Sequence, residues 1–203
     1  MRLFVALNLP DAERQRIHSV AATLRNAGFP VRWVSAESLH ITMKFLGEVR
    51  HDRVGSVVGA VEAAASKTPA FDLGLGGFGA FPALRRPRVI WLGAEATPEL
   101  RCLKHDLEWG LGELGFAREV RAFAPHVTLG RAHASSGAGD FRRLQELFEA
   151  IEYAATVRVD TVDLMRSTLT PAGARYDVVE RMALRAPVPA KPPAAGASGE
   201  SRE

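Results

Sequence analysis

The sequence predicts a mixed α+β fold in a chain of 203 residues. Segments whose apolar residues recur at helical spacing alternate with short β-type runs. Several runs alternate apolar and polar residues, as residues 157–164 do, which favours half-buried antiparallel strands over the all-apolar strands of a doubly wound parallel sheet. Helices and strands also recur in the same order in both halves of the chain, and each half has one strand that begins near a histidine.

Four helices are predicted from apolar periodicity and from residues typical of helix ends. The third has the clearest ends, because Thr97 is a good N-cap, Pro98 suits the first helical position and Gly115 can end the helix. Asp140 is expected to cap the fourth. The predicted helices span about residues 11–28, 54–61, 97–115 and 140–151.

Seven β-type runs separate these helices. The glycine-rich residues 74–79 resemble a phosphate-binding loop only superficially, because no capped helix follows them, so a bent strand or loop is expected there. The predicted strands span residues 3–7, 39–46, 71–78, 88–93, 126–131, 157–166 and 175–184.

The domain organisation is predicted to be one folded unit over residues 1–186. Residues 187–203 consist almost wholly of Pro, Ala, Gly, Ser and charged residues, a composition that predicts a disordered tail. The apolar run at residues 1–7 is too short for a signal peptide or a bilayer span, so no membrane association is expected. Cys102 is the only cysteine, which favours a reducing compartment, and we expect a cytoplasmic protein.

The positive charge of the chain comes mostly from arginine: 22 of the 26 basic residues are Arg, although the formal net charge is only +3. Guanidinium groups bind phosphate and stack on bases, so this composition is compatible with a nucleotide or RNA ligand. A GC-rich genome would also produce it. The sequence has no strongly basic stripe of the kind that coats DNA.

Two predicted strands contain the same motif, a histidine followed two residues later by a threonine. The motifs are His40–Thr42, within LHITM, and His126–Thr128, within PHVTL. Because side chains alternate along a strand, each histidine projects with its threonine from one face while the apolar neighbours anchor the other face. Each strand therefore presents one imidazole beside one hydroxyl group.

These residues suit acid-base chemistry better than metal or covalent chemistry. A catalytic zinc usually takes three protein ligands, and no third ligand accompanies either motif. The sequence has no nucleophile elbow, and Cys102 lies on a predicted helix without an obvious base. Imidazole titrates near neutrality, so one histidine can accept a proton from water while the other donates one to a leaving oxygen. The hydroxyl groups can donate hydrogen bonds to a phosphate that gains charge.

The tetrads HITM (residues 40–43) and HVTL (residues 126–129) resemble the paired HxTx signatures of the 2H phosphoesterase superfamily. Their setting is similar to its RNA 2',3'-cyclic phosphodiesterase branch, also described as 2'-5' RNA ligase-like. The resemblance covers about residues 1–184. It extends to RLFVAL at residues 2–7, Trp33, KFLGE at residues 44–48, GAFP at residues 79–82, RVIW at residues 88–91, Ser167 and GARY at residues 173–176.

The resemblance implies a bilobal fold of two pseudo-symmetric halves, with antiparallel sheets around a central cleft and helices outside. It also implies metal-independent hydrolysis of an RNA 2',3'-cyclic phosphate end to a 2'-phosphate, without a cofactor. His40 would be the general acid on the departing 3'-oxygen and His126 the general base on water. Thr42 and Thr128 would hold the phosphate oxygens.

The same resemblance implies that Phe45 stacks on the terminal base and that Arg131 contacts the substrate. Each lies five residues after its histidine, so an ideal strand would direct it to the opposite face. A bulge or strand end near Gly130, and a twist near Phe45, would have to redirect them. The alternatives are core packing for Phe45 and a solvated strand end for Arg131. Lys44 shares the face of His40 in an ideal strand and could add charge to the cleft; the alternative is an exposed surface lysine.

The expected partner is an RNA that ends in a 2',3'-cyclic phosphate, such as a tRNA fragment, and we expect a monomer. Two other functions stay open. An RNA 5'-hydroxyl in place of water would make the reaction a 2'-5' ligation. A module that binds RNA ends without turning them over is the other, although binding alone needs no proton donor and acceptor.

Overall fold

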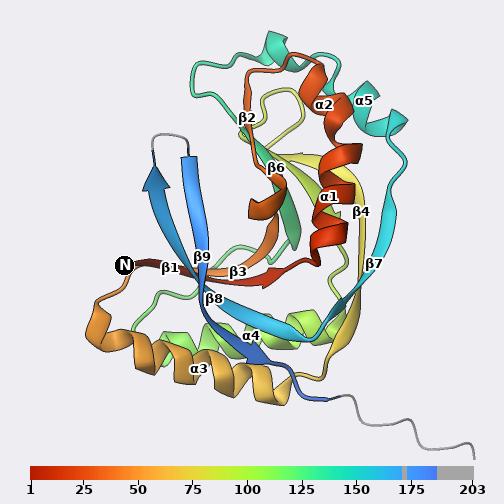
Figure 1. Ribbon diagram of the computed structural model, residues 1–203. Coiled ribbons are helices and arrows are strands. Elements are labelled where there is room, and N and C mark those ends of the chain that lie inside the picture. The colour runs from red at the N-terminus through yellow and green to blue at the C-terminus, as the bar shows by residue number, and fades with distance from the viewer. Residues whose placement is uncertain (171–172, 187–203) are drawn as a thin grey trace, which may run out of the picture.

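The computed structural model describes residues 1–170 and 173–186 (Figure 1). Their strands form one antiparallel sheet in the order β7-β4-β5-β6-β3-β1-β8-β9, and β2 pairs with β6. The strands are β1 (Arg2–Asn8), β2 (Val31–Trp33), β3 (His40–Glu48), β4 (Phe71–Phe81), β5 (Val89–Ala94), β6 (His126–Ala132), β7 (Ala154–Val159), β8 (Thr161–Thr170) and β9 (Gly173–Ala183). The α-helices are α1 (Asp11–Val20), α2 (Ala22–Asn26), α3 (Val54–Lys67), α4 (Pro98–Glu113) and α5 (Leu144–Ala150), and the 3-10 helices are η1 (Ala36–Ser38), η2 (His51–Arg53) and η3 (Ala138–Phe141).

The sheet divides into two lobes where β3 meets β6. We call β3, β1, β8 and β9 with helices α3 and α4 the His40 lobe, and β6, β5, β4, β7 and β2 with α1, α2 and α5 the His126 lobe. Figure 1 shows α3 and α4 side by side beneath the first lobe, and α1, α2 and α5 together on the outside of the second. The predicted bilobal α+β fold is confirmed. Each lobe, however, takes elements from both halves of the chain.

The predicted helices are mostly confirmed. The Thr97 hydroxyl accepts a hydrogen bond from the Leu100 N–H (3.2 Å) at the start of α4. The first predicted helix is divided into α1 and α2 at Ala21. The prediction that Asp140 caps the fourth helix was wrong. The Asp140 carboxylate accepts from the Gly137 N–H (2.8 Å) within η3, and α5 begins only at Leu144.

The strand predicted over residues 157–166 is two strands. Asp160 separates β7 from β8, and these strands lie far apart in the sheet, β7 beside β4 and β8 beside β1. The Asp160 carbonyl accepts from the Leu184 N–H (2.8 Å), so this point is held against the end of β9. The alternation of apolar and polar residues continues from β7 through Asp160 into β8. The sequence pattern therefore does not show that the chain moves to another part of the sheet at this point. The three-residue strand β2 was not predicted, because it is too short to show a period.

The core is continuous through both lobes. In α4, Leu100, Leu103, Leu107 and Leu111 are completely buried, and each such side chain stabilises the fold by about 1.5–3 kcal/mol. The helices in the described residues are too short or too polar to cross a membrane. The predicted tail, residues 187–203, lies outside the described residues.

Candidate active site

The two His-Thr motifs meet at the seam between the lobes. Ile41 of β3 and Val127 of β6 are cross-strand partners, and both are completely buried. Because side chains alternate along a strand, the residues flanking this pair face away from the core. The antiparallel register then sets each histidine across from the threonine of the other strand. The opposed pairs are His40 with Thr128 and Thr42 with His126.

A cavity of about 410 Å³ opens on this face of the sheet. Its lining includes five of the six predicted site residues: His40, Thr42, Phe45, Thr128 and Arg131. His126 is the exception. Its ring packs against Phe81 and Trp91, with ring centroids 5.2 and 6.3 Å away.

Both histidines are held in the same way. The Nδ1 atom of His40 lies 2.8 Å from the Ser38 carbonyl oxygen, and Nδ1 of His126 lies 2.7 Å from the Ala124 carbonyl oxygen. A carbonyl oxygen can only accept, so each Nδ1 carries the hydrogen. The Nε2 atoms are left to exchange protons with a ligand, as a base when neutral and as an acid when protonated.

The surroundings of His40 favour its neutral form. Its ring packs against Phe4 and Tyr176, with centroids 5.0 and 5.1 Å away. Burial lowers its pKa to about 4, against the opposing effect of the Ser38 hydrogen bond, and the charges of Arg131 and His126 lower it further. In the free protein at neutral pH, His40 is therefore uncharged.

A β-bulge turns Phe45 into the cavity. Val5 pairs with Lys44 and Ala6 pairs with Thr42, so Met43 has no partner on β1. Met43 and Lys44 are consecutive buried residues, after which Phe45 is 59% exposed and lines the cavity. The bulge inverts the alternation of the strand, so Phe45 shares the face of His40 although it lies five residues later.

A second bulge does the same for Arg131. Ile90 pairs with Gly130 and Trp91 pairs with Thr128, so Leu129 is skipped. Leu129 stands three residues after His126, as Met43 stands three residues after His40. The two strands therefore present a histidine, a threonine and a redirected fifth residue in the same order, although one ends in an aromatic ring and the other in a guanidinium group.

Lys44 does not point into the cleft, although it would do so in an ideal strand. The bulge turns it to the core side, where only 1% of it is exposed. There its Nζ donates to Glu108 Oε2 (2.6 Å) and to the Ala117 carbonyl oxygen (2.8 Å).

Several cavity residues were not identified from the sequence. Phe4 lies in an apolar run that reads as core, and it is 2% exposed, yet its ring contacts His40. Tyr176 lies in a predicted strand with no motif around it that marks a site, and its ring packs against His40 as well. Arg2 and Arg32 also line the cavity. No periodic signal marks either arginine, because one is at the chain start and the other is in the short β2.

The rim of the cavity is basic. Arg32 is the cross-strand partner of Arg131, so both side chains leave the same face, and Arg2 enters from β1. No Asp or Glu is among the residues that line this cavity, and none of the three arginines has an ion pair with another residue of the described chain. The cavity therefore offers positive charge to an anionic ligand.

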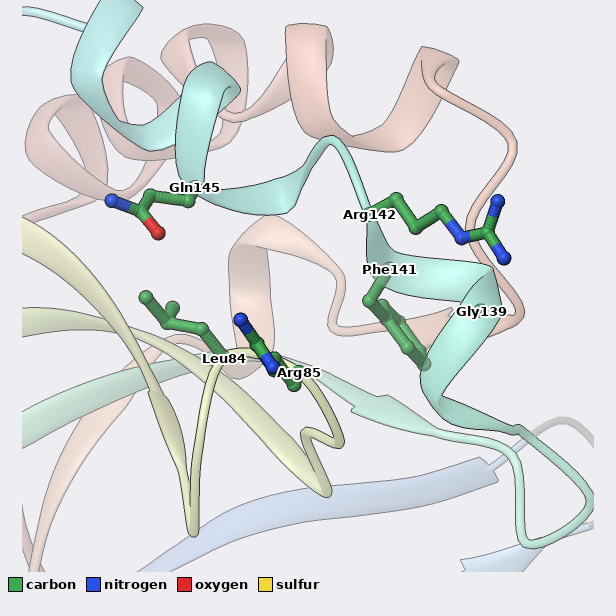
Figure 2. Close-up of a pocket in the computed structure, with 6 residues that line it drawn as sticks. All are labelled: Leu84, Arg85, Gly139, Phe141, Arg142 and Gln145. Carbon is green, nitrogen blue, oxygen red and sulfur yellow. The ribbon is translucent and has the colours of Figure 1, made fainter.

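Another cavity, of about 480 Å³, lies between the loop after β4 and the segment from η3 to α5. Figure 2 shows Arg85 and Leu84 beneath Gln145, while Arg142 points away from them. Its lining has no histidine, carboxylate or hydroxyl group. This cavity lacks groups for acid-base chemistry, so we take the His-Thr cavity as the candidate active site.

Metal-ligating side chains do not gather in the part of the chain that the structure describes: no three His, Cys, Asp or Glu residues lie close enough together to hold an ion. Cys102 is exposed and free.

The chain resembles known proteins along most of its length. It is 33% identical over 180 residues to an RNA 2',3'-cyclic phosphodiesterase of Thermotoga maritima, covering 88% of this chain and 93% of that protein. It is 32% identical to a protein of the same name from Methanothermobacter thermautotrophicus, covering 89% and 97%.

The chain also resembles solved structures in its fold. TT0787 of Thermus thermophilus superposes with a TM-score of 0.77 at 29% identity, covering 92% of this chain and 99% of that one. Escherichia coli LigT complexed with 3'-AMP gives 0.69 at 28% identity, covering 90% and 97%. The family model described as LigT like Phosphoesterase matches twice in succession, at residues 7–91 and 92–176. The chain therefore belongs to the LigT-like phosphoesterase family.

Proposed function

We propose that this protein hydrolyses 2',3'-cyclic phosphate ends of RNA to 2'-phosphates, using its two histidines and no metal ion. The observation that carries the proposal is the register at the lobe seam, where the Ile41–Val127 pair sets each histidine position opposite the threonine position of the other strand. Two curated relatives of similar length carry the name RNA 2',3'-cyclic phosphodiesterase, which supports the same substrate class.

The proposed reaction is an in-line displacement at phosphorus. Nε2 of neutral His126 takes a proton from water, whose oxygen forms a bond to phosphorus. The bond from phosphorus to the 3'-oxygen breaks, and protonated His40 gives its proton to that oxygen. Thr42 and Thr128 donate hydrogen bonds to the non-bridging oxygens as negative charge develops on them. The product keeps its phosphate on the 2'-oxygen.

This scheme requires protonated His40 in the substrate complex, whereas His40 is neutral in the free protein. The cyclic phosphate carries one negative charge, and an opposite charge within about 4–6 Å favours the charged form of an imidazole. We therefore propose that substrate binding raises the pKa of His40. The enzyme would take up this proton when it binds the substrate.

RNA is the favoured substrate class because of the residues around the catalytic groups. Phe45 offers an exposed ring on which the terminal base can stack. Arg2, Arg32 and Arg131 supply donors for phosphate groups. We also propose that the protein acts as a monomer in the cytoplasm; its mass in solution and the fractionation of cells would test these points.

Product analysis tests the proposal. The purified protein is incubated in excess chelator with an RNA that ends in a 2',3'-cyclic phosphate, with and without an RNA that bears a 5'-hydroxyl. We expect a 2'-phosphate under both conditions. A need for divalent metal would refute the mechanism, a 3'-phosphate would refute the assigned leaving group, a 2'-5' linkage would establish ligation, and tight binding without product would establish an end-binding module.

A further inference from the structure

We propose that Lys104 is a positioning residue for Phe45: it holds the bulge at Met43 that aims the Phe45 ring into the cavity. The inference rests on the proposed function, because it concerns how the terminal base of the substrate is bound. Lys104 lies on α4, on the core side of β3, and only 7% of it is exposed. It cannot touch a ligand in the cavity, so its effect must pass through β3.

The ammonium group of Lys104 uses all three of its donors. Its Nζ donates to the Met43 carbonyl oxygen (2.6 Å), to Glu108 Oε1 (2.6 Å) and to Glu119 Oε2 (2.9 Å). The first of these acceptors belongs to the bulged residue itself. An unpaired buried carbonyl is unfavourable, so this bond stabilises the bulged form of β3.

Lys44 completes the cluster from the strand side. Its Nζ and that of Lys104 bind the two oxygens of Glu108, and Glu108 Oε2 also accepts from the Glu119 N–H (3.1 Å). Burial of Glu108 raises its pKa, but the bonds from Lys104 and Lys44 outweigh this effect, so the net pKa is lowered and the carboxylate stays ionised. The cluster joins β3, α4 and residues 117–119 on the side opposite the cavity.

The other lobe holds its bulge with backbone alone. The Leu129 carbonyl oxygen, which corresponds to that of Met43, accepts from the Val34 N–H (2.8 Å) just after β2. Gly130 stands where Lys44 stands in β3, and a Cβ atom there would lie 2.5 Å from Val31. A glycine lets β2 approach directly in the His126 lobe, whereas two lysine side chains bridge to residues 117–119 in the His40 lobe.

The presence of lysine rather than arginine at position 104 supports a specific role for its ammonium group. The chain has 22 arginines and only four lysines, yet both buried basic residues of the described chain are lysines. An ammonium group is compact and can point three donors at separate acceptors, which the planar guanidinium group cannot do in the same space.

Without the bulge, each side chain of β3 after Thr42 would point to the opposite face of the sheet. In a regular strand, Lys44 would face the cavity and Phe45 the core. Lys104 therefore decides which of these two side chains the ligand meets. Its loss should weaken binding of the base without changing the acid-base chemistry.

The experiment compares two substrates that share the reacting group. Adenosine 2',3'-cyclic phosphate offers a base to Phe45, whereas 1-O-methylribose 2',3'-cyclic phosphate has none. For Lys104→Met we expect KM for the adenosine substrate to rise about 5- to 100-fold, the range for loss of one base-aromatic stack. The value of kcat should change less than about threefold, and KM for the base-free substrate should stay the same. Lys67→Met, at the exposed end of α3, is the matched control.

A double-mutant cycle shows whether Lys104 acts through Phe45. Phe45→Ala should raise KM for the adenosine substrate alone, and adding Lys104→Met should then change little. Additive effects, or a fall in kcat on both substrates, would overturn the inference. If Lys104→Met does not fold, Lys104→Arg keeps the charge beside both glutamates, and the same cycle applies to it. A wild-type protein that hydrolyses neither substrate would instead refute the proposed function.

Discussion

Ile41 and Val127 are cross-strand partners, the one such pair between β3 and β6 in the described residues. Both side chains are completely buried, so this contact between the lobes is anchored in the core. The same pair sets the separation of the two imidazoles, because each histidine is a direct neighbour in sequence. The proposed catalytic arrangement thus depends on the packing of two aliphatic residues that lie in the core and not in the cavity.

Loss of either histidine should remove most of the activity. His40→Ala and His126→Ala are each expected to lower kcat by about 100- to 10,000-fold, the usual contribution of one acid-base group. A substrate with sulfur in place of the 3'-oxygen separates their roles, because a thiolate leaves without a proton. This substrate should restore His40→Ala and not His126→Ala. If this substrate restored only His126→Ala, His126 would be the general acid and His40 the general base.

The threonine hydroxyl groups should contribute to catalysis without supporting the fold. Thr42→Val and Thr128→Val keep the volume of the side chain and remove the donor, and we expect each to lower kcat by about 100-fold. Melting temperatures should stay within a few degrees of the wild-type value. Thr168→Val, on the exposed end of β8, is the control and should leave kcat unchanged. Full activity of Thr42→Val would exclude a phosphate contact by its hydroxyl group.

Gly130 should tolerate no side chain. In Gly130→Ala the new Cβ atom would lie 2.5 Å from Val31 and 2.8 Å from Trp33, so β2 must move away from β6. We expect a lower free energy of unfolding and a raised KM, because Arg131 follows directly. Gly59→Ala, in the exposed interior of α3 with no atom near its Cβ, should instead stabilise the protein by about 0.5–1 kcal/mol. Denaturant titration of both variants measures the contrast, and equal effects would contradict it.

The low pKa of His40 predicts loss of stability in acid. The folded protein binds the proton with a pKa of about 4 and the unfolded chain with a pKa near 6.5, so the unfolded state holds more protons between these values. The stabilisation is fully present above pH 6.5 and decreases as the pH falls to 4, by at most about 1.4 kcal/mol per pH unit. His40→Gln should flatten this part of a curve of unfolding free energy against pH. An unchanged slope would show that His40 titrates normally.

Substrate binding should take up a proton at His40. In the His126→Ala variant, turnover should be slowed about 100- to 10,000-fold, so binding can be measured before much substrate is hydrolysed, and a cyclic phosphate does not titrate near neutrality. Calorimetry at pH 6.5 in buffers of different ionisation enthalpy should therefore report uptake approaching one proton per site, absent in the His40→Gln, His126→Ala double variant. Binding without uptake would contradict protonation of His40 by the ligand.

The rim arginines should distinguish RNA from a mononucleotide. Arg32→Ala is expected to weaken binding of an oligonucleotide end and to reduce the slope of log affinity against log salt by about 0.7, the value for one single-stranded phosphate contact. Hydrolysis of adenosine 2',3'-cyclic phosphate should change little. Arg50→Ala, which removes an exposed arginine paired with Asp52, is the control. Equal losses on both substrates would place Arg32 at the reacting phosphate.

The sequence alone was sufficient for the parts of the site that follow strand periodicity. The spacing of His40 and Thr42, and of His126 and Thr128, predicts four side chains on one face, and the register of β3 and β6 agrees with this. Strand periodicity does not predict the bulges, because Met43 and Leu129 have the pattern of ordinary apolar strand residues. Only the implied roles of Phe45 and Arg131 required the strands to be irregular. The bulge or strand end expected near Gly130 is a bulge at Leu129, whereas the twist expected near Phe45 is a bulge at Met43.

Long-range partners account for the other differences. Lys44 reads as a cleft or surface residue because its acceptors, Glu108 and the Ala117 carbonyl, lie more than sixty residues away. The passage from β7 to β8 through Asp160 was missed because both strands keep the same alternation. A local pattern reports which face of a strand is buried, and it does not report the neighbouring strand.

The interleaving of the lobes also decides how the protein could be divided. A break between β5 and α4 would leave β1, β3 and α3 of the His40 lobe on one fragment and α4, β8 and β9 on the other. The same break would separate β6 from β5 and β4 in the His126 lobe. Each fragment would hold one repeat of the family and half of each core, so the two should fold only in each other's presence. This protein is therefore suited to fragment complementation, with recovered hydrolysis as the signal that two attached partners have met.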